Sequence, residues 1–290
     1  QVLASIEEQG KLTEQLKAQI LAATTQVVVE DLYRPYRPKR RTRATIAKEK
    51  GLEGLANIIY MQLTNAPITE EAKAYLSEEK EVHTIEEAIQ GAKDILAETI
   101  SDEADYRMHT REMTVRDGII TSTAKDEETQ SVYEMYYSFE EKINKIAGHR
   151  VLALNRGEKE KILTVKVEAP EEQILAYLEK HIIRKENPHT KDILKDTIAD
   201  SYSRLIAPAI EREIRSDLTE KAEDGAIKVF GKNLEQLLMQ PPIVGQVVLG
   251  WDPAFRTGCK LAVVDATGKV LDTTVIYPTE PQNKVEQAKK

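Results

Sequence analysis

The stretch TIEEAIQGAKDILAETI, residues 84–100, carries the strongest structural signal in this sequence of 290 residues. Apolar residues recur along it at the spacing of one helix face: Ile85, Ala88, Ile89, Ala92, Ile95, Leu96 and Ile100. Thr84, followed three residues later by Glu87, matches a capping box, in which both side chains accept hydrogen bonds from free backbone amides at a helix start. The stretch therefore predicts a long helix with one face in a hydrophobic core.

Most of the surrounding sequence has the same helical periodicity. Helices are predicted over residues 11–23, 25–32, 44–50, 52–63 and 69–76 before this stretch, and over 101–118, 130–147, 149–157, from 170 and over 193–222 after it. Gly51 predicts a tight turn between two helices, as in a helix-turn-helix unit. Ser101 is a candidate helix cap, and Pro208 predicts either two long helices or one kinked helix.

Strand signals are fewer and gather at the end of the chain. The valines at 27–29 locally favour a strand, in competition with the helix predicted there. Short strands are predicted over residues 118–124, 162–168, 244–250, 260–265 and 270–277, and a last helix over 283–290. The fold class expected is mainly α: a multi-helical scaffold with helix-turn-helix-like elements, followed near residue 243 by the first strands of an α/β domain.

Positive charge is concentrated in YRPYRPKRRTR, residues 33–43. From Tyr33 to Lys50 there are eight Lys or Arg residues and one acid, a formal charge of +7, so the rest of the chain must carry −15 to reach the net charge of −8. Phosphate binding depends on the electrostatic potential within about a Debye length, roughly 8 to 10 Å, and it depends less on the overall charge of the chain. Because Pro35 and Pro38 favour extended backbone, an extended basic connector is predicted.

This connector has the residue types of a single-strand nucleic-acid contact. Guanidinium groups bind phosphate oxygens in pairs, and tyrosine rings stack on unpaired bases. The candidate binding residues are Tyr33, Arg34, Tyr36, Arg37, Lys39, Arg40, Arg41 and Arg43. The alternative is that these arginines pair with acids elsewhere in the chain, and the connector then serves as a packing element of a protein-interaction scaffold.

A second candidate site is Asp252, in VVLGWDPAFRTGCKLAVVD, residues 247–265. A strand that ends in aspartate, a tight turn and a second strand resemble the opening of a ribonuclease H-like fold. Nucleases of that fold use several carboxylates to hold two metal ions, so Asp252 alone would not suffice. The alternative is that Asp252 caps a turn, and the bulk of Phe255 and Arg256 argues against a phosphate cradle here.

The composition excludes several classes of protein. An apolar content of 41% is that of a globular chain, and the sequence has neither a run of about 18 apolar residues nor a signal peptide, so membrane insertion and export are not expected. Cys259 is the single cysteine, which fits a cytoplasmic location. The five histidines lack the spacing of a metal site, and no cofactor is expected. Gln1 and a predicted helix that runs to Lys290 indicate a piece of a longer protein.

Two segments together resemble the Tex family of bacterial transcription accessory proteins: DLYRPYRPKRRTRATIAKEKGLEGLA, residues 31–56, and VLGWDPAFRTGCKLAVVD, residues 248–265. Residues 149–160 and 205–242 resemble the same family, so the resemblance covers essentially the whole chain. The sequence departs from the family pattern at Gly54, Trp251 and Ala254, where proline, a smaller aliphatic residue and glycine are usual.

This resemblance implies three regions. They are a Tex N-terminal helical region over residues 1–140 with the basic connector 33–43, a central helical region over 141–243, and an incomplete YqgF-type ribonuclease H-like domain over 244–290. It also implies a non-enzymatic, nucleic-acid-binding scaffold whose partners are RNA or single-stranded DNA and RNA polymerase. A metal-dependent nuclease that uses Asp252 and a pure protein-interaction scaffold remain the alternatives.

Overall fold

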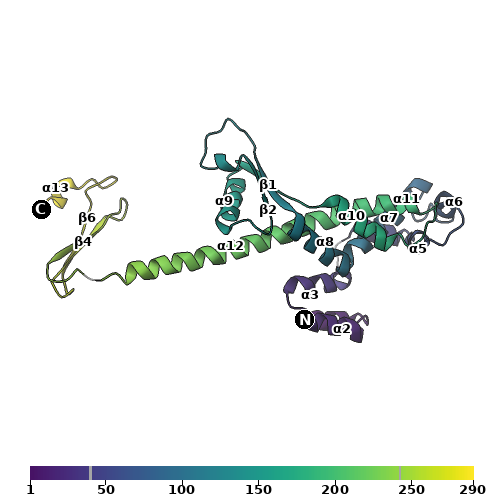
Figure 1. Cartoon of the computed structure of the whole chain (residues 1–290), viewed down its shortest axis with the longest axis horizontal. Helices are drawn as coiled ribbons and strands as arrows, with labels where there is room; N and C mark the ends of the chain where they lie inside the picture. Colours follow the sequence, from purple (N-terminus) through teal and green to yellow (C-terminus); the bar gives the residue numbers. More distant parts are fainter. Residues whose placement is uncertain (39–40, 242) are drawn as a thin grey trace. The chain divides into compact units, whose positions relative to one another are not determined.

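The computed structural model describes residues 1–38, 41–241 and 243–290, which form two compact units (Figure 1). The first unit covers residues 1–226 and the second covers residues 227–290. The prediction of a mainly helical fold followed by a small sheet is confirmed. Within the described ranges, no helix is both long enough and apolar enough to cross a membrane.

The first unit is built from helices with one small sheet. Its helices are α1 (Val2–Glu8), α2 (Glu14–Ala22), α3 (Gln26–Tyr33), α4 (Arg43–Glu49), α5 (Glu53–Met61), α6 (Ile68–Lys73), α7 (Ile85–Asp102), α8 (Ala104–Asp117), α9 (Gly148–Lys159), α10 (Glu171–Ile182), α11 (Lys191–Asp200) and the first part of α12 (Ala207–Leu238). Its strands are β1 (Ile119–Ala124), β2 (Ser138–Lys142) and β3 (Leu163–Glu168).

Helix α7 is the centre of the main core, as the sequence predicts. The Thr84 hydroxyl accepts from the Glu87 amide at 3.1 Å, and the Glu87 carboxylate accepts from the Thr84 amide at 3.2 Å, which confirms the capping box. The apolar stripe of α7 packs in one cluster with α4, α5 and α11. The turn between α4 and α5 is also confirmed, because Gly51 has a φ of +80°, where only glycine is free of strain.

Two predictions about the helices of this unit are wrong. Ser101 does not cap α8. It lies buried in the last turn of α7, donates to the Glu98 carbonyl, and Glu103 precedes α8 instead. Residues 130–147 do not form a helix but a 3-10 turn (Glu134–Tyr136) followed by strand β2, because β1 offers a pairing partner that the local sequence does not reveal.

The predicted interruption at Pro208 takes the form of a π-helical turn. Residues 201–206 adopt this wider helix between α11 and α12, and the Ala207 amide donates to the carbonyl of Tyr202, five residues earlier. Proline has no amide to give to the carbonyl of Arg204 and its ring clashes with that carbonyl in an α-helix. The wider turn just before Pro208 lets the chain continue in helical form.

The small sheet and α9 enclose a second, separate core. The strand order is β2-β1-β3, all antiparallel, and Ser122 of β1 lies opposite Phe139 of β2. Leu154 of α9 and Leu163 of β3 are fully buried in this core. Tyr133 and Tyr136 are buried among them, although the backbone at these two residues is not α-helical.

An ion pair joins this second core to α12. Arg215 of α12 donates to both carboxylate oxygens of Glu158, at 3.0 and 2.6 Å, and to the Asn155 side chain at 3.1 Å. The hydrogen bonds from Arg215 hold the pKa of Glu158 below its usual value of 4.5. Protonation of Glu158 therefore weakens the joint between α9 and α12.

We expect the stabilising effect of Glu158 to depend on pH. Because its pKa is lower in the folded chain than in the unfolded chain, this effect is complete above about pH 5 and is lost as the pH falls through the folded value. The stability difference between the natural chain and Glu158→Gln, measured from urea midpoints, should be largest at neutral pH and shrink toward pH 3. Glu127→Gln, at an exposed site with no ion pair to a described residue, should show no such trend.

The second unit holds an antiparallel sheet of order β4-β5-β6 (β4 Val248–Asp252, β5 Cys259–Val264, β6 Val270–Ile276) and the short helix α13 (Val285–Ala288). The predicted hairpin between β5 and β6 is confirmed, since the Asp265 amide donates to the Lys269 carbonyl and Gly268 has a φ of +86°. Strand β4 begins later in the chain than predicted, and β5 begins one residue earlier.

Candidate nucleic-acid interface

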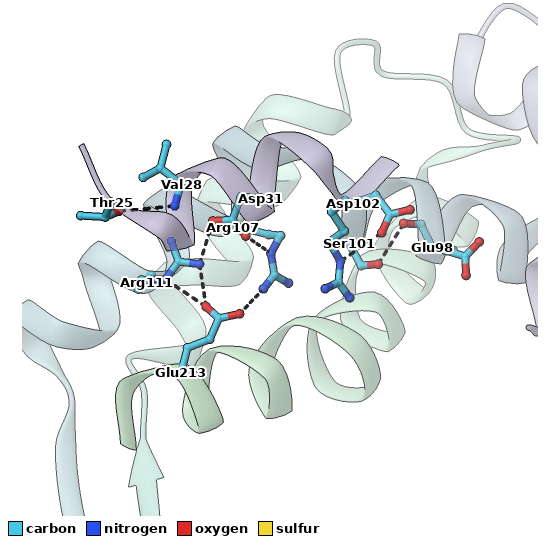
Figure 2. Close-up of polar contacts among 10 residues, drawn as sticks. Thr25, Val28, Asp31, Glu98, Ser101, Asp102, Arg107, Arg111 and Glu213 are labelled. Atoms are coloured by element: carbon cyan, nitrogen blue, oxygen red, sulfur yellow. Dashed lines mark hydrogen bonds and ion pairs between the residues drawn. The ribbon is translucent and has the colours of Figure 1, made fainter. Parts of the chain in front are cut away.

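The basic segment, residues 33–43, begins in the last residue of α3. Thr25 caps this helix, its hydroxyl accepting from the Val28 amide at 3.4 Å (Figure 2). Leu32 packs against the cluster around buried Ile6, and this cap and packing outweigh the strand preference of the consecutive valines. The basic segment therefore starts from a capped and packed helix.

Asp31 anchors α3 in the first unit through a buried ion-pair network with Arg107 and Arg111 of α8 and Glu213 of α12 (Figure 2). Arg107 donates to Asp31 at 2.6 Å and to Glu213 at 2.6 Å. Arg111 donates to Asp31 at 2.8 Å and to Glu213 at 2.6 Å. Two carboxylates and two guanidinium groups balance in charge, so this Asp31 network ties three helices together without a net buried charge.

The Asp31 network is largely removed from water. The side chains of Arg107 and Asp31 are only 1% and 4% exposed. Burial lowers the pKa of Arg111, but the hydrogen bonds that Arg111 donates to Glu213 and the charge of Asp31 outweigh burial and raise it. Arg107 Nη1 is buried without a hydrogen-bond partner in the described part of the chain. Removing one member would leave the others as buried, unbalanced charges.

The Asp31 network was not predicted from the sequence. Helix α8 has no apolar stripe, because its buried residues are mostly polar: Arg107, Thr110 and Thr114, with Met113 as the one apolar member among those described. A polar helix without an apolar face is usually taken as exposed.

The first part of the basic segment is folded rather than extended. Arg34–Tyr36 forms a 3-10 helix with Pro35 in its first turn, where the missing proline amide costs nothing, and the backbone becomes extended only at Arg37. Arg34 Nε donates to Asp102 of α7 at 3.1 Å. The prediction of an extended connector is therefore wrong for this part, and Arg34 has a structural partner.

Tyr33 and Tyr36 are half-buried and pack against the N-terminal hydrophobic cluster of α1 and α2. The Tyr33 hydroxyl lies 2.9 Å from Ser5 Oγ, and the Tyr36 carbonyl accepts from Gln9 Nε2 at 2.8 Å. These contacts hold the two rings in place and fix the path of the chain that follows.

Three of the candidate arginines face water. Arg37 and Arg43 are exposed and have no ion pair within 4 Å to a residue that the structure describes. The pKa of Asp200 is lowered mainly by the hydrogen bond from Arg204, and the charge of Arg43 makes a smaller contribution in the same direction. Arg41 pairs with Glu49 at 3.0 Å, but both side chains are more than half exposed, and such pairs are weak. Lys39 and Arg40 lie outside the described residues.

Asp252, the other candidate, is the last residue of β4 and is exposed. Lys260, its partner across the sheet, lies 3.8 Å away and is also exposed. Among the residues that the structure describes, no three His, Cys, Asp or Glu side chains are grouped as a metal site. The contacts of Asp252 are those of an exposed strand end.

Fold and site define a mainly helical protein in which exposed arginines follow the anchored helix α3. The family model described as Tex central region-like matches residues 64–230, and the model described as Tex protein YqgF-like domain matches residues 246–290. The chain belongs to the Tex family.

Individual relatives agree with this assignment. YdcI of Bacillus subtilis is 55% identical over 99% of the chain, and the Neisseria gonorrhoeae protein called transcriptional accessory protein Tex is 36% identical over 97%. The human S1 RNA-binding domain-containing protein 1 is 30% identical over 95%. The chain spans 40%, 38% and 29% of the lengths of these three relatives.

Proposed function

We propose that the exposed arginines of the basic segment bind the phosphates of RNA or single-stranded DNA, in a protein that serves the transcription machinery as a scaffold and not as an enzyme. The observation that carries this proposal is the exposure of Arg37, Arg41 and Arg43, which follow in the sequence the helix α3 that the Asp31 network anchors. The names of two relatives also support this proposal: one is called a transcriptional accessory protein and the other an S1 RNA-binding domain-containing protein.

The other candidate residues have supporting roles in this proposal. Arg34 positions the segment through Asp102, and the rings of Tyr33 and Tyr36 fix its start against α1 and α2. Lys39 and Arg40 add positive charge within the same run of sequence. RNA polymerase is proposed as a partner from the family alone.

The proposal is tested by the salt dependence of binding to fluorescein-labelled single-stranded RNA and DNA. Removal of one phosphate-binding side chain should reduce the slope of log affinity against log salt by about 0.7, so the triple variant with Arg37, Arg41 and Arg43 changed to Ser should have a slope smaller by about 2. This variant should keep its thermal unfolding midpoint, because its three side chains are exposed.

The matched control changes three other exposed cations, Arg116, Lys142 and Lys145, to Ser and removes the same charge. It should bind with nearly the slope of the natural chain. Equal slopes for the two triple variants would contradict the proposal. A basic-segment variant that unfolds earlier yet binds as before would show that the segment is a packing element.

A further inference from the structure

A cleft of about 660 Å³ lies between α8 and α10, and its described lining shares no residue with the basic segment proposed to bind nucleic acid. Its walls come from residues 103–112 on one side and residues 177–184 on the other, with Tyr60 of α5 at one edge. All of these residues belong to the first unit. Two features distinguish the cleft. Aromatic rings are stacked in it, and its carboxylates have no cationic partner among the described residues.

The aromatic rings form one continuous wall. Tyr177 stacks on His109 with ring centroids 3.8 Å apart and planes 19° apart, and it lies 4.2 Å from the ring of His181. Tyr106 meets Tyr177 edge-on at 6.4 Å. His181 is one helical turn after Tyr177, and its Nδ1 lies 2.8 Å from the Tyr177 carbonyl, so the wall is held in a fixed geometry.

The carboxylates of the cleft are not neutralised by neighbouring cations. Glu103, Asp105 and Glu112 line the cleft, and none of them has an ion pair within 4 Å to any residue in the described ranges. Among the described residues of the lining, the one permanent cation is Arg184, whose Nε donates to the His181 carbonyl at 3.2 Å. With neutral histidines, the lining therefore carries a formal charge of −2, from three carboxylates and one guanidinium group.

The pKa values agree with an acidic, partly dry cleft. Partial burial and the charge of Asp105 raise the pKa of Glu103. Burial, with smaller contributions from Tyr60 and Glu103, raises the pKa of Tyr106 to about 12. A bound cation would relieve the repulsion between these groups, whereas a bound anion would increase it.

This combination selects a particular ligand chemistry. Flat aromatic rings bind a planar cation through its face, and carboxylates at the rim accept hydrogen bonds from its edge. A guanidinium group satisfies both requirements, while an ammonium group lacks the plane. An unpaired nucleic-acid base would stack equally well, but its phosphates would be repelled by the three carboxylates. The cleft is therefore complementary to arginine and not to nucleic acid.

We propose that the cleft between α8 and α10 binds an arginine side chain in a basic segment of a partner protein. The guanidinium group stacks on the face of His109 that Tyr177 leaves uncovered and donates to Asp105 and Glu112. The proposal assigns the chain a protein-binding site that is separate from the basic segment and opposite to it in charge.

The probe is a fluorescein-labelled peptide of alternating glycine and arginine, titrated by fluorescence anisotropy with the natural chain. Its counterpart has citrulline, the neutral isostere, at every arginine. We expect the arginine peptide to bind at least tenfold more tightly than the citrulline peptide. Asp105→Asn with Glu112→Gln should weaken arginine-peptide binding at least fivefold, and Tyr177→Leu should do the same without a change in charge.

The control variant Glu78→Gln with Glu79→Gln removes the same charge from positions outside the cleft lining and should bind as the natural chain does. The triple variant of the basic segment should also bind the peptide unchanged, which separates this site from the nucleic-acid contact. Equal binding of both peptides, or full affinity in the folded Tyr177→Leu variant, would overturn the proposal. Loss of RNA affinity in Tyr177→Leu would identify the cleft as a nucleic-acid site and overturn it as well.

Discussion

Replacement of Arg107 by leucine is expected to lower the thermal unfolding midpoint by roughly 10 °C. Arg107 is the most buried member of the Asp31 network, and its loss leaves Asp31 and Glu213 with only Arg111 to balance them among the described residues. Breaking a buried pair in this way costs about 3 to 5 kcal/mol, and each kcal/mol moves the midpoint by about 2 to 4 °C in a unit of this size. Circular dichroism during heating measures the change.

Arg116→Leu is the matched control, because it removes the same side chain from the same helix. Arg116 is exposed and pairs with its neighbour Asp117, so its loss should leave the midpoint unchanged. A midpoint for Arg107→Leu equal to that of the control would mean that the Asp31 network does not hold the helices together. The start of the basic segment would then be held mainly by the contacts of Tyr33, Arg34 and Tyr36.

The second large effect is expected at Leu163, which is fully buried between β3 and α9. Leu163→Ala should lower the free energy of unfolding by about 2 to 5 kcal/mol, because the surrounding side chains fill the space only in part. Leu63→Ala, at a position that is 63% exposed, should change it by less than about 0.5 kcal/mol. Urea unfolding of the three chains provides the measurement.

Gly157 of α9 allows a sharper test of the same contact. A methyl group at Gly157 would lie 2.6 Å from Leu163 Cδ1, so Gly157→Ala alone should destabilise the chain by about 1 to 3 kcal/mol. In the double variant, the new methyl group occupies part of the space that Leu163→Ala vacates. The combined cost should therefore be smaller than the sum of the two single costs by about 1 kcal/mol, and strict additivity would show that the contact is not tight.

The helices of the main core could be predicted from local pattern alone. The capping box at Thr84 and the apolar stripe of α7 are readable because their partners lie within one or two turns. The strand β2 was not readable in the same way. Phe139 of β2 and the tyrosines just before it, Tyr133 and Tyr136, fit helical spacing. The strand forms because residues 138–142 pair with β1, which lies well before them in the chain.

The candidate site was found only in part, for a similar reason. The density of arginine in residues 33–43 is visible in the sequence, but exposure is not. Arg34 and Arg37 look alike in the sequence, yet Arg34 pairs with Asp102 of α7 and Arg37 faces water. The Asp31 network and the cleft between α8 and α10 both depend on side chains brought together from distant helices, and no spacing rule predicts them.

Because of the π-helical turn before Pro208, the orientation of α12 depends on the number of residues in this part of the chain. Such a turn holds one residue more than the α-helical path it replaces, and each residue turns an α-helix by about 100°. Loss of one residue between positions 201 and 206 would therefore rotate α12, turning Ile210 away from the main core and Glu213 away from α8. Insertions and deletions in residues 201–206 should therefore disrupt the packing of α12, although a loop would tolerate them. Relatives that keep the Asp31 network should also keep the number of residues between α11 and Glu213.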